Sequence, residues 1–235
     1  MSQRFYDPTI DKNSTFCKLD AIQSGHLCKV LRKSEGDRVE FTNGKGDLFS
    51  ATISLAHPKK SEVSLSYRLS EDRTENQITI AMALPKSMDR FEWFIEKATE
   101  IGIARIIPLT SRFSERKNLN KERAERILDS AFKQSLRLYR PILDELTPVQ
   151  ILFEKRETWD QKFIGHCYPG DKTDLIDLCD SKKSKLMLIG PEGDFSEEEV
   201  NRALDLGYKE VSLGSSRLRT ETAGLMALAR MILKE

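Results

Sequence analysis

The 235-residue sequence contains little of what a metal centre or a disulfide framework requires. It has only three histidines and four cysteines, and no two cysteines form a C-x-x-C pair. A structural zinc site needs four Cys or His ligands at short spacings, so we expect no metal. Cysteines without regular spacing are typical of reduced, mostly buried thiols, which favours a cytoplasmic protein.

Long apolar runs and phosphate-binding glycine motifs are missing as well. The longest largely apolar stretch, Ile78 to Leu84, is far too short to span a bilayer, and the N-terminus has no apolar segment like that of a signal peptide. We therefore expect no membrane partner. The sequence also has no G-x-x-x-x-G-K-[ST] segment, which argues against a P-loop hydrolase or kinase.

Charged residues make up 32% of the sequence, yet they nearly cancel to a formal net charge of +1. The average hides a basic segment, because residues 112–140 hold nine Lys and Arg against four Asp and Glu. A polyanionic partner needs local cations rather than a high overall charge, so this segment favours such a partner. A solvated helix face is the commoner origin of a charge run and stays open as the alternative.

Residues 1–73 have the pattern of a small β-barrel. Alternating apolar and polar residues predict strands at Val39–Phe41, Leu48–Ile53 and Val63–Tyr67. Asn43-Gly44 between the first two strands is a strong hairpin signal, because both residue types tolerate positive φ. Within these residues only Leu19 to Arg32 has a helical pattern.

Residues 74–235 alternate strand and helix patterns, which indicates an α/β domain with a parallel sheet. The expected strands are Ile78–Leu84, Ala104–Leu109, Lys162–Cys167, Lys185–Ile189 and Glu210–Leu213. The last helix, Glu221–Leu233, is apolar nearly all round. It must therefore be buried, either within the domain or against a second subunit.

Capping residues set the expected ends of two further helices. Ser87 is a candidate N-cap for a helix that Gly102 closes. Ser196 and Glu199 have the spacing of a capping box, and this helix is expected to stop at Gly207.

The basic segment contains the longest expected helix, which Asn120 caps and which ends near Arg140, before Pro141. Helical spacing would place four cations on one face beside an apolar stripe. These are Arg126, Lys133, Arg137 and Arg140. A helix that presents cations to a nucleic-acid backbone has this arrangement.

Three loops follow expected strands at the carboxyl edge of the sheet, where ligands bind in open α/β folds. They are His166–Gly170, Gly190–Phe195 and Leu213–Ala223. Glycines at 190 and 193 would let the backbone approach a flat, neutral ligand such as adenine. Each loop can also be a plain turn. Glu221 suits a helix N-terminus in any case, and Arg219 can simply pair with it.

Several motifs resemble the RsmE family, and they run in order over almost the whole chain. The N-terminal motifs resemble its PUA-like barrel, and two later ones, IGPEG and LGSSRLRTETA, resemble its two cofactor loops. The matching segments are His26–Arg32, Asn43–Gly46, Glu96–Gly102, Ser114–Arg116, Gln134-Ser135, Ile189–Gly193 and Leu213–Ala223.

The resemblance implies a 16S ribosomal RNA (uracil-1498-N3)-methyltransferase of the SPOUT superfamily, acting on the small ribosomal subunit. It implies S-adenosylmethionine (SAM) as the cofactor and a homodimer as the assembly. It further implies a trefoil-knotted α/β domain at residues 74–235, preceded by a PUA-like RNA-binding β-barrel at residues 1–73. The cofactor-binding residues are then expected to be His166, Cys167, Gly190, Pro191, Glu192, Gly193, Leu213, Gly214 and Leu218.

Methylation of uracil N3 requires loss of the imide proton and stabilisation of the negative charge on N3, O2 and O4. Arginine stays cationic and offers a planar fork of donors. We therefore expect Arg219 to be catalytic, with Glu221 orienting it or relaying the proton. The RNA-binding residues are expected to be Arg4, His26, Arg32, Lys133 and Arg137.

Departures from the family pattern occur at Asp194, where glycine is frequent, and at Ser216 and Arg217. Asp194 and Arg217 could compensate each other by charge. The departures motivate an alternative, a catalytically inactive RNA-binding protein with a degenerate α/β domain. A Rossmann-type methyltransferase is disfavoured, because Pro85-Lys86-Ser87, without glycine, follows the first strand of the α/β domain.

Overall fold

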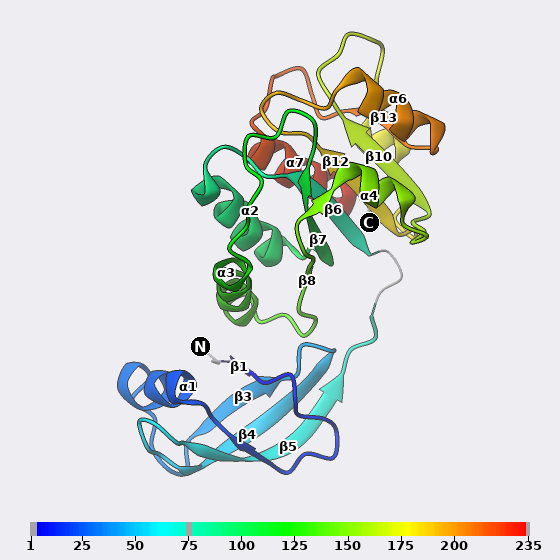
Figure 1. Cartoon of the computed structure of the whole chain (residues 1–235). Helices are drawn as coiled ribbons and strands as arrows, with labels where there is room; N and C mark the ends of the chain where they lie inside the picture. The colour runs from blue at the N-terminus through cyan, green and yellow to red at the C-terminus, as the bar shows by residue number, and fades with distance from the viewer. Residues whose placement is uncertain (1–3, 74–76, 234–235) are drawn as a thin grey trace. The chain divides into compact units, whose positions relative to one another are not determined.

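A computed structural model describes residues 4–73 and 77–233 and divides them into two compact units (Figure 1). Unit 1 comprises residues 4–73 together with residues 132–140. Unit 2 comprises residues 77–131 and 141–233. No helix in the described residues is long and apolar enough to cross a membrane.

Unit 1 is a curled five-stranded sheet of the PUA-like kind, in the order β1-β3-β4-β5-β2. The strands are β1 (Arg4–Tyr6), β2 (Phe16–Lys18), β3 (Arg38–Thr42), β4 (Asp47–Leu55) and β5 (Glu62–Ser70). Alternate residues face a core that includes Phe5, Phe41 and Phe49. The expected hairpin is confirmed, with Gly44 at φ 71° in the turn between β3 and β4.

The helical segment of unit 1 is confirmed, although its second half differs from an α-helix. Helix α1 (Ala21–Gly25) continues into a π-helix, η1 (His26–Val30). Asp20 caps α1 by accepting the backbone N–H of Gln23 at 2.7 Å. Leu27 is the fully buried residue of η1 and packs into the core of unit 1.

Helix α3 (Lys121–Gln134) is shorter than expected. Its start is confirmed, because the Asn120 side chain accepts the backbone N–H of Arg123 at 3.0 Å. Its end is not, since the helix stops at Gln134 and Leu136 adopts a left-handed backbone with φ 55°. A left-handed residue cannot continue a right-handed helix.

Residues 138–140 use their backbone groups elsewhere within unit 1. Arg140 donates its N–H to the Gly44 carbonyl at 2.9 Å, and Gly46 donates to the Leu138 carbonyl at 3.0 Å. These bonds to the β3–β4 hairpin replace the helical ones. The expectation that Arg137 and Arg140 continue one helical face is therefore wrong.

Unit 2 is an α/β fold with an eight-stranded sheet in the order β11-β13-β10-β12-β6-β7-β8, with β9 also beside β7. Every pairing in it is parallel, as expected. The strands are β6 (Ile78–Ala83), β7 (Arg105–Thr110), β8 (Ile142–Leu143), β9 (Thr147–Pro148), β10 (Gln161–Gly165), β11 (Thr173–Asp174), β12 (Lys185–Ile189) and β13 (Lys209–Ser212).

Helices cover both faces of this sheet, as a parallel sheet requires (Figure 1). Residues of α2, α5 and α7 share one core cluster, and residues of α4 and α6 share the other. The helices are α2 (Met88–Ile101), α4 (Val149–Glu154), α5 (Leu175–Leu178), α6 (Glu197–Asp205) and α7 (Thr220–Leu233). The expected burial of the last helix is confirmed within unit 2, where Ala227, Leu228 and Met231 are fully buried.

Most of the expected helix ends are confirmed. Gly102 closes α2 in the left-handed region with φ 114°, and Ser196 with Glu199 forms the complete capping box of α6. Ser87 is the N-cap residue of α2, but its side chain makes no capping hydrogen bond.

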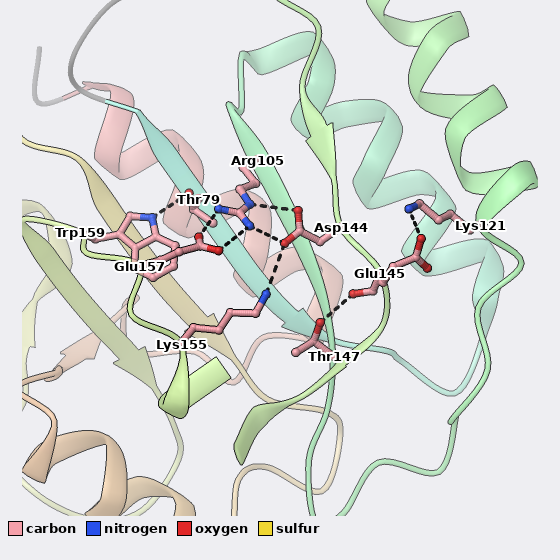
Figure 2. A network of polar contacts seen from close by, with 9 residues as sticks. All are labelled: Thr79, Arg105, Lys121, Asp144, Glu145, Thr147, Lys155, Glu157 and Trp159. Atoms are coloured by element: carbon pink, nitrogen blue, oxygen red, sulfur yellow. Dashed lines mark hydrogen bonds and ion pairs between the residues drawn. The ribbon is translucent and has the colours of Figure 1, made fainter. Parts of the chain in front are cut away.

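An ion-pair network holds the amino-terminal ends of β6 and β7, on the edge of the sheet opposite the loops that follow β10, β12 and β13 (Figure 2). Arg105 binds Asp144 through two bonds, Nε to Oδ1 at 3.0 Å and Nη2 to Oδ2 at 2.6 Å, and also pairs with Glu157. Trp159 donates to Thr79 Oγ1 at 3.1 Å. The network ties β7 to the chain around 144 and 157.

Asp144→Ala should lower the free energy of unfolding by about 1–3 kcal/mol, because the change leaves the Arg105 guanidinium without its two-bond partner. Urea denaturation gives the value. The control is the neighbouring Glu145→Ala, since Glu145 is 77% exposed, against 12% for Asp144, and pairs only with Lys121 in the described part of the chain. Its expected cost is below about 1 kcal/mol. Equal costs for the two variants would contradict a structural role of the network.

Candidate active site

Three loops extend from neighbouring parallel strands at the carboxyl edge of the unit 2 sheet. Residues 166–170 follow β10, residues 190–195 follow β12, and residues 213–219 follow β13. Two hydrogen bonds join them. Cys167 donates its backbone N–H to Asp194 Oδ2 at 2.6 Å, and Thr220 donates its hydroxyl to the Gly190 carbonyl at 3.1 Å. The loops singled out from the sequence therefore come together around the chain of residues 190–195.

His166 uses both ring nitrogens within the fold. Its Nε2 lies 2.6 Å from Glu210 Oε1 on β13, and its Nδ1 accepts the backbone N–H of Tyr168 at 3.2 Å. Because Nδ1 accepts a hydrogen bond, the proton is assigned to Nε2, which donates to Glu210. The imidazole therefore fixes the turn after β10, and His166 itself has only its backbone groups available to a ligand.

Asp194 fastens the second loop to the first. Its Oδ2 accepts from Cys167, and its Oδ1 accepts the Phe195 backbone N–H at 2.8 Å. The backbone of Asp194 is left-handed at φ 67°, a conformation that glycine adopts without strain. No hydrogen bond or ion pair joins Asp194 to Arg217 among the described residues, so direct pairing does not explain these two departures.

The glycines of the second loop lie in tight packing, where a side chain would press on its neighbours. A Cβ on Gly190 would lie 3.2 Å from the Asp194 carbonyl carbon and 3.2 Å from the Phe195 nitrogen. A Cβ on Gly193 would lie 3.0 Å from the Cβ of Phe113. Pro191 is buried between them, and its carbonyl accepts the Asp194 N–H at 2.9 Å.

Glu192 connects this loop to the segment that follows β6. Its carboxylate accepts the backbone N–H of Lys86 at 3.1 Å and lies 3.6 Å from Arg90 Nη1. Arg90, on the first turn of α2, also lies 3.8 Å from Glu221 through its Nε. Arg90 thus bridges the second and third loops, and the sequence reasoning missed it.

The third loop places a buried carboxylate beside an exposed arginine. Leu213 and Leu218 are half-buried, and Gly214 turns the chain at φ 121°. The Arg219 carbonyl accepts the Ala223 N–H at 2.8 Å and so begins α7, while its side chain is exposed. No side-chain hydrogen bond or ion pair to Arg219 occurs in the described chain, so it does not pair with Glu221.

Glu221 is 7% exposed, and its carboxylate has an ion-pair partner, Arg90. Its Oε1 faces Arg90, whereas its Oε2 is buried and has no hydrogen-bond partner among residues 4–73 and 77–233. A buried carboxylate oxygen without a donor costs free energy. An open acceptor of this kind suits a site that binds a donor or a cation from outside the chain.

The five candidate RNA-binding residues all belong to unit 1. Arg4 is largely used within the fold, since it pairs with Glu40 at 2.9 Å and donates to the Leu136 carbonyl. His26, Arg32 and Arg137 are exposed, and Lys133 is half-buried. Arg4 therefore has a structural role that the sequence did not reveal, and the other four keep side-chain surface available to solvent.

Comparisons with known proteins agree with this arrangement. An RNA methyltransferase domain matches residues 72–232, and an RNA methyltransferase PUA domain matches residues 19–66. Ribosomal RNA small subunit methyltransferase E of Synechocystis is 31% identical, over 91% of this chain and 71% of its own length.

Two solved structures share the fold over nearly the whole chain. A Porphyromonas gingivalis protein described as a probable rRNA methyltransferase is 38% identical, covers 97% of this chain and 95% of its own, and gives a TM-score of 0.88. A Legionella pneumophila methyltransferase solved with bound SAM is 27% identical, covers 98% and 97%, and gives 0.86. The chain therefore belongs to the RNA methyltransferase family, as its RsmE-like motifs predict.

Proposed function

We propose that the protein transfers a methyl group from SAM to N3 of a uridine in 16S ribosomal RNA, position 1498 by family resemblance. The observation that carries the proposal is the junction of the IGPEG and LGSSRLRTETA loops, through the Thr220–Gly190 bond, in a chain of the RNA methyltransferase family. The two motifs that resemble the family's cofactor loops lie together at the carboxyl edge of one parallel sheet, where such folds bind ligands.

The residues of the three loops fit SAM. SAM carries positive charge, and Glu221 supplies a buried carboxylate at the end of the third loop. The loops offer backbone donors and acceptors for an adenine, as turns without bulky side chains can. The residues proposed to hold the cofactor are His166, Cys167, Gly190, Pro191, Glu192, Gly193, Leu213, Gly214 and Leu218. For His166 the role falls to the backbone, because its ring is used within the fold.

Arg219 and Glu221 are proposed to do the chemistry on the base. Bound SAM supplies an electrophilic methyl group and takes back the electron pair of the broken carbon–sulfur bond. Arg219, free of internal partners in the described chain, donates to the oxygens on which negative charge develops. Glu221, whose Oε2 has no hydrogen-bond partner in the described chain, accepts the N3 proton, and the N3 electron pair then forms the new bond to carbon.

Further parts of the proposal concern RNA and assembly. We infer that residues 1–73 form an RNA-binding domain and residues 74–235 a trefoil-knotted SPOUT methyltransferase domain. His26, Arg32, Lys133 and Arg137 are proposed to contact RNA phosphates, with Arg4 supporting them from within unit 1. The proposed substrate is the small ribosomal subunit, the proposed assembly a homodimer and the proposed location the cytoplasm.

SAM should protect Cys167 from alkylation. Burial and the nearby Asp194 carboxylate raise the pKa of the Cys167 thiol, so its thiolate fraction at pH 8 is low and its reaction with iodoacetamide is slow. Saturating SAM is expected to slow it at least about tenfold further if the turn after β10 holds the cofactor. Asp194→Ala, which removes the negative charge, should speed the reaction without SAM.

Peptide mass spectrometry measures each thiol separately, and Cys28 of unit 1 is the internal control, since it is half-buried and lies in the other unit. Its rate should not respond to SAM. Equal rates at Cys167 with and without saturating SAM would remove the turn after β10 from the cofactor site.

Tritium transfer from labelled SAM into small ribosomal subunits tests the function itself. The subunits are purified from a strain that lacks this gene, and the product is digested to nucleosides. Label in 3-methyluridine is the expected result. SAM binding without transfer would point to another RNA, and neither binding nor transfer would favour the inactive RNA-binding protein.

A further inference from the structure

Two adjoining hollows lie beside the loop of residues 190–193, and of the residues that line them only Glu192 and Gly193 have a role proposed above. One, of about 380 Å³, is lined by Lys86, Phe113, Glu115, Glu192 and Gly193. The other, of about 430 Å³, is lined by Lys86, Glu115, Arg116, Lys117 and Asn118. Because they share Lys86 and Glu115, we treat them as one depression, the acceptor hollow.

Phe113 gives the acceptor hollow an aromatic face. The residue is 48% exposed, so about half of the side-chain surface is accessible. It is seated against the second loop, since a Cβ on Gly193 would lie only 3.0 Å from the Phe113 Cβ. An exposed aromatic side chain at this place offers a platform for an unstacked base, and stacking on it tolerates any base because every base has a π face.

Three cations line the acceptor hollow. Lys86 belongs to both of its parts, and Arg116 and Lys117 line the part that adjoins the one with Phe113. Lys86 Nζ lies 2.7 Å from Glu115 Oε1, and this hydrogen bond raises the pKa of Lys86, which keeps it charged. Arg116 donates from Nε to the Lys86 carbonyl at 2.9 Å. A guanidinium held through Nε retains four N–H bonds on its terminal nitrogens, which is the geometry that recognises a phosphate. Lys117 adds a third cation that is exposed.

We propose that the acceptor hollow binds a nucleotide of the substrate RNA, with its base stacked on Phe113 and its phosphate held by Arg116 and Lys117. The inference rests on the proposed function, because an enzyme that methylates a base must receive it unstacked. The hollow shares Glu192 and Gly193 with the loop proposed to hold the cofactor. A base on Phe113 would therefore lie next to the methyl donor.

Single-turnover methyl transfer with varied concentrations of small ribosomal subunits tests the stacking. Phe113→Ala should raise the half-saturating concentration about tenfold to a hundredfold, the loss expected for one base stack. Phe113→Trp should restore it, whereas Phe113→Leu, which keeps apolar bulk without a π face, should not. Trp93→Ala is the matched control, since Trp93 is 45% exposed and lies on α2 outside the hollow. SAM affinity by calorimetry should be unchanged in all four variants.

A leucine variant equal to the wild type would overturn the stacking. So would a Phe113→Ala protein that loses its oligomeric state by light scattering, because the side chain would then belong to a subunit interface. An oligouridylate carrying one 5-iodouridine gives a readout independent of turnover. Irradiation should cross-link it to the peptide that contains Phe113. Cross-links only at other peptides would also overturn the proposal, and this result stands even if wild-type methyl transfer fails.

Discussion

Arg219→Ala should lower the rate of methyl transfer about 100-fold to 1000-fold, the cost of removing one donor from a developing anion. SAM affinity should stay within about twofold, because the Arg219 side chain is exposed and has no hydrogen-bond or ion-pair partner in the described chain. The fold should not be affected, since only the carbonyl of Arg219 is used, as the first acceptor of α7. Single-turnover rates at saturating SAM and RNA measure the effect.

Two further variants make this prediction specific. Arg217→Ala removes a cation two residues away in the same exposed loop, and its rate should stay within about threefold of the wild type. Arg219→Lys keeps the charge but loses the planar fork, so it should recover only part of the rate. If Arg217→Ala and Arg219→Ala lower the rate equally, the loop acts through its overall charge, and Arg219 is not the specific donor to the developing anion.

The elements predicted correctly from the sequence are those whose signals are local. The Asn43-Gly44 pair marks the β3–β4 hairpin, in which residues 43–46 connect the two strands, and the capping box of α6 lies within four consecutive residues. Strands β6 and β12 are short apolar runs that the parallel sheet buries on both faces. These patterns depend on neighbours in the sequence, so the elements that they predict are also found in the folded chain.

The predicted end of α3 was wrong, because the hydrogen bonds that replace the helical ones come from residues distant in the sequence. Residues 135–140 carry a helical pattern and no proline until Pro141, so nothing local stops the helix. The β3–β4 hairpin binds the backbone of Leu138 and Arg140 from almost a hundred residues earlier. Tertiary hydrogen bonds overrode the local preference, as they often do.

In the candidate site, too, the features with a signal in the sequence could be predicted and those set by distant contacts could not. The loops after β10, β12 and β13 could be found because parallel strands end at one edge. Arg90 was missed, although the same rule contains a signal for it. Strand β6 lies beside β12, so the start of α2 must lie near the loop after β12. That His166 would turn its ring to Glu210 could not be predicted, because it depends on the register of β10 and β13.

Glu221→Gln should lower the rate about 100-fold or more while leaving the protein as stable as the wild type or more stable. A general base contributes about 100-fold to 10,000-fold, and an amide cannot take the N3 proton. The stability expectation follows from burial. Glu221 is 7% exposed, faces Arg90 only at 3.8 Å, and holds Oε2 without a donor in the described chain. Replacing a poorly compensated buried charge by a neutral group of equal size removes a desolvation cost.

The two readouts separate catalysis from structure. If Glu221 served only to anchor Arg90 and the start of α7, the amide would weaken that pairing, and the free energy of unfolding in urea would fall together with the rate. Arg90→Gln is the matched comparison, because it leaves the Glu221 carboxylate buried with no cation and should destabilise the protein. A stable Glu221→Gln protein that binds SAM but does not methylate RNA would establish the carboxylate as a functional group kept at a cost to the fold. A destabilised Glu221→Gln protein with an unchanged rate would assign it to the fold alone.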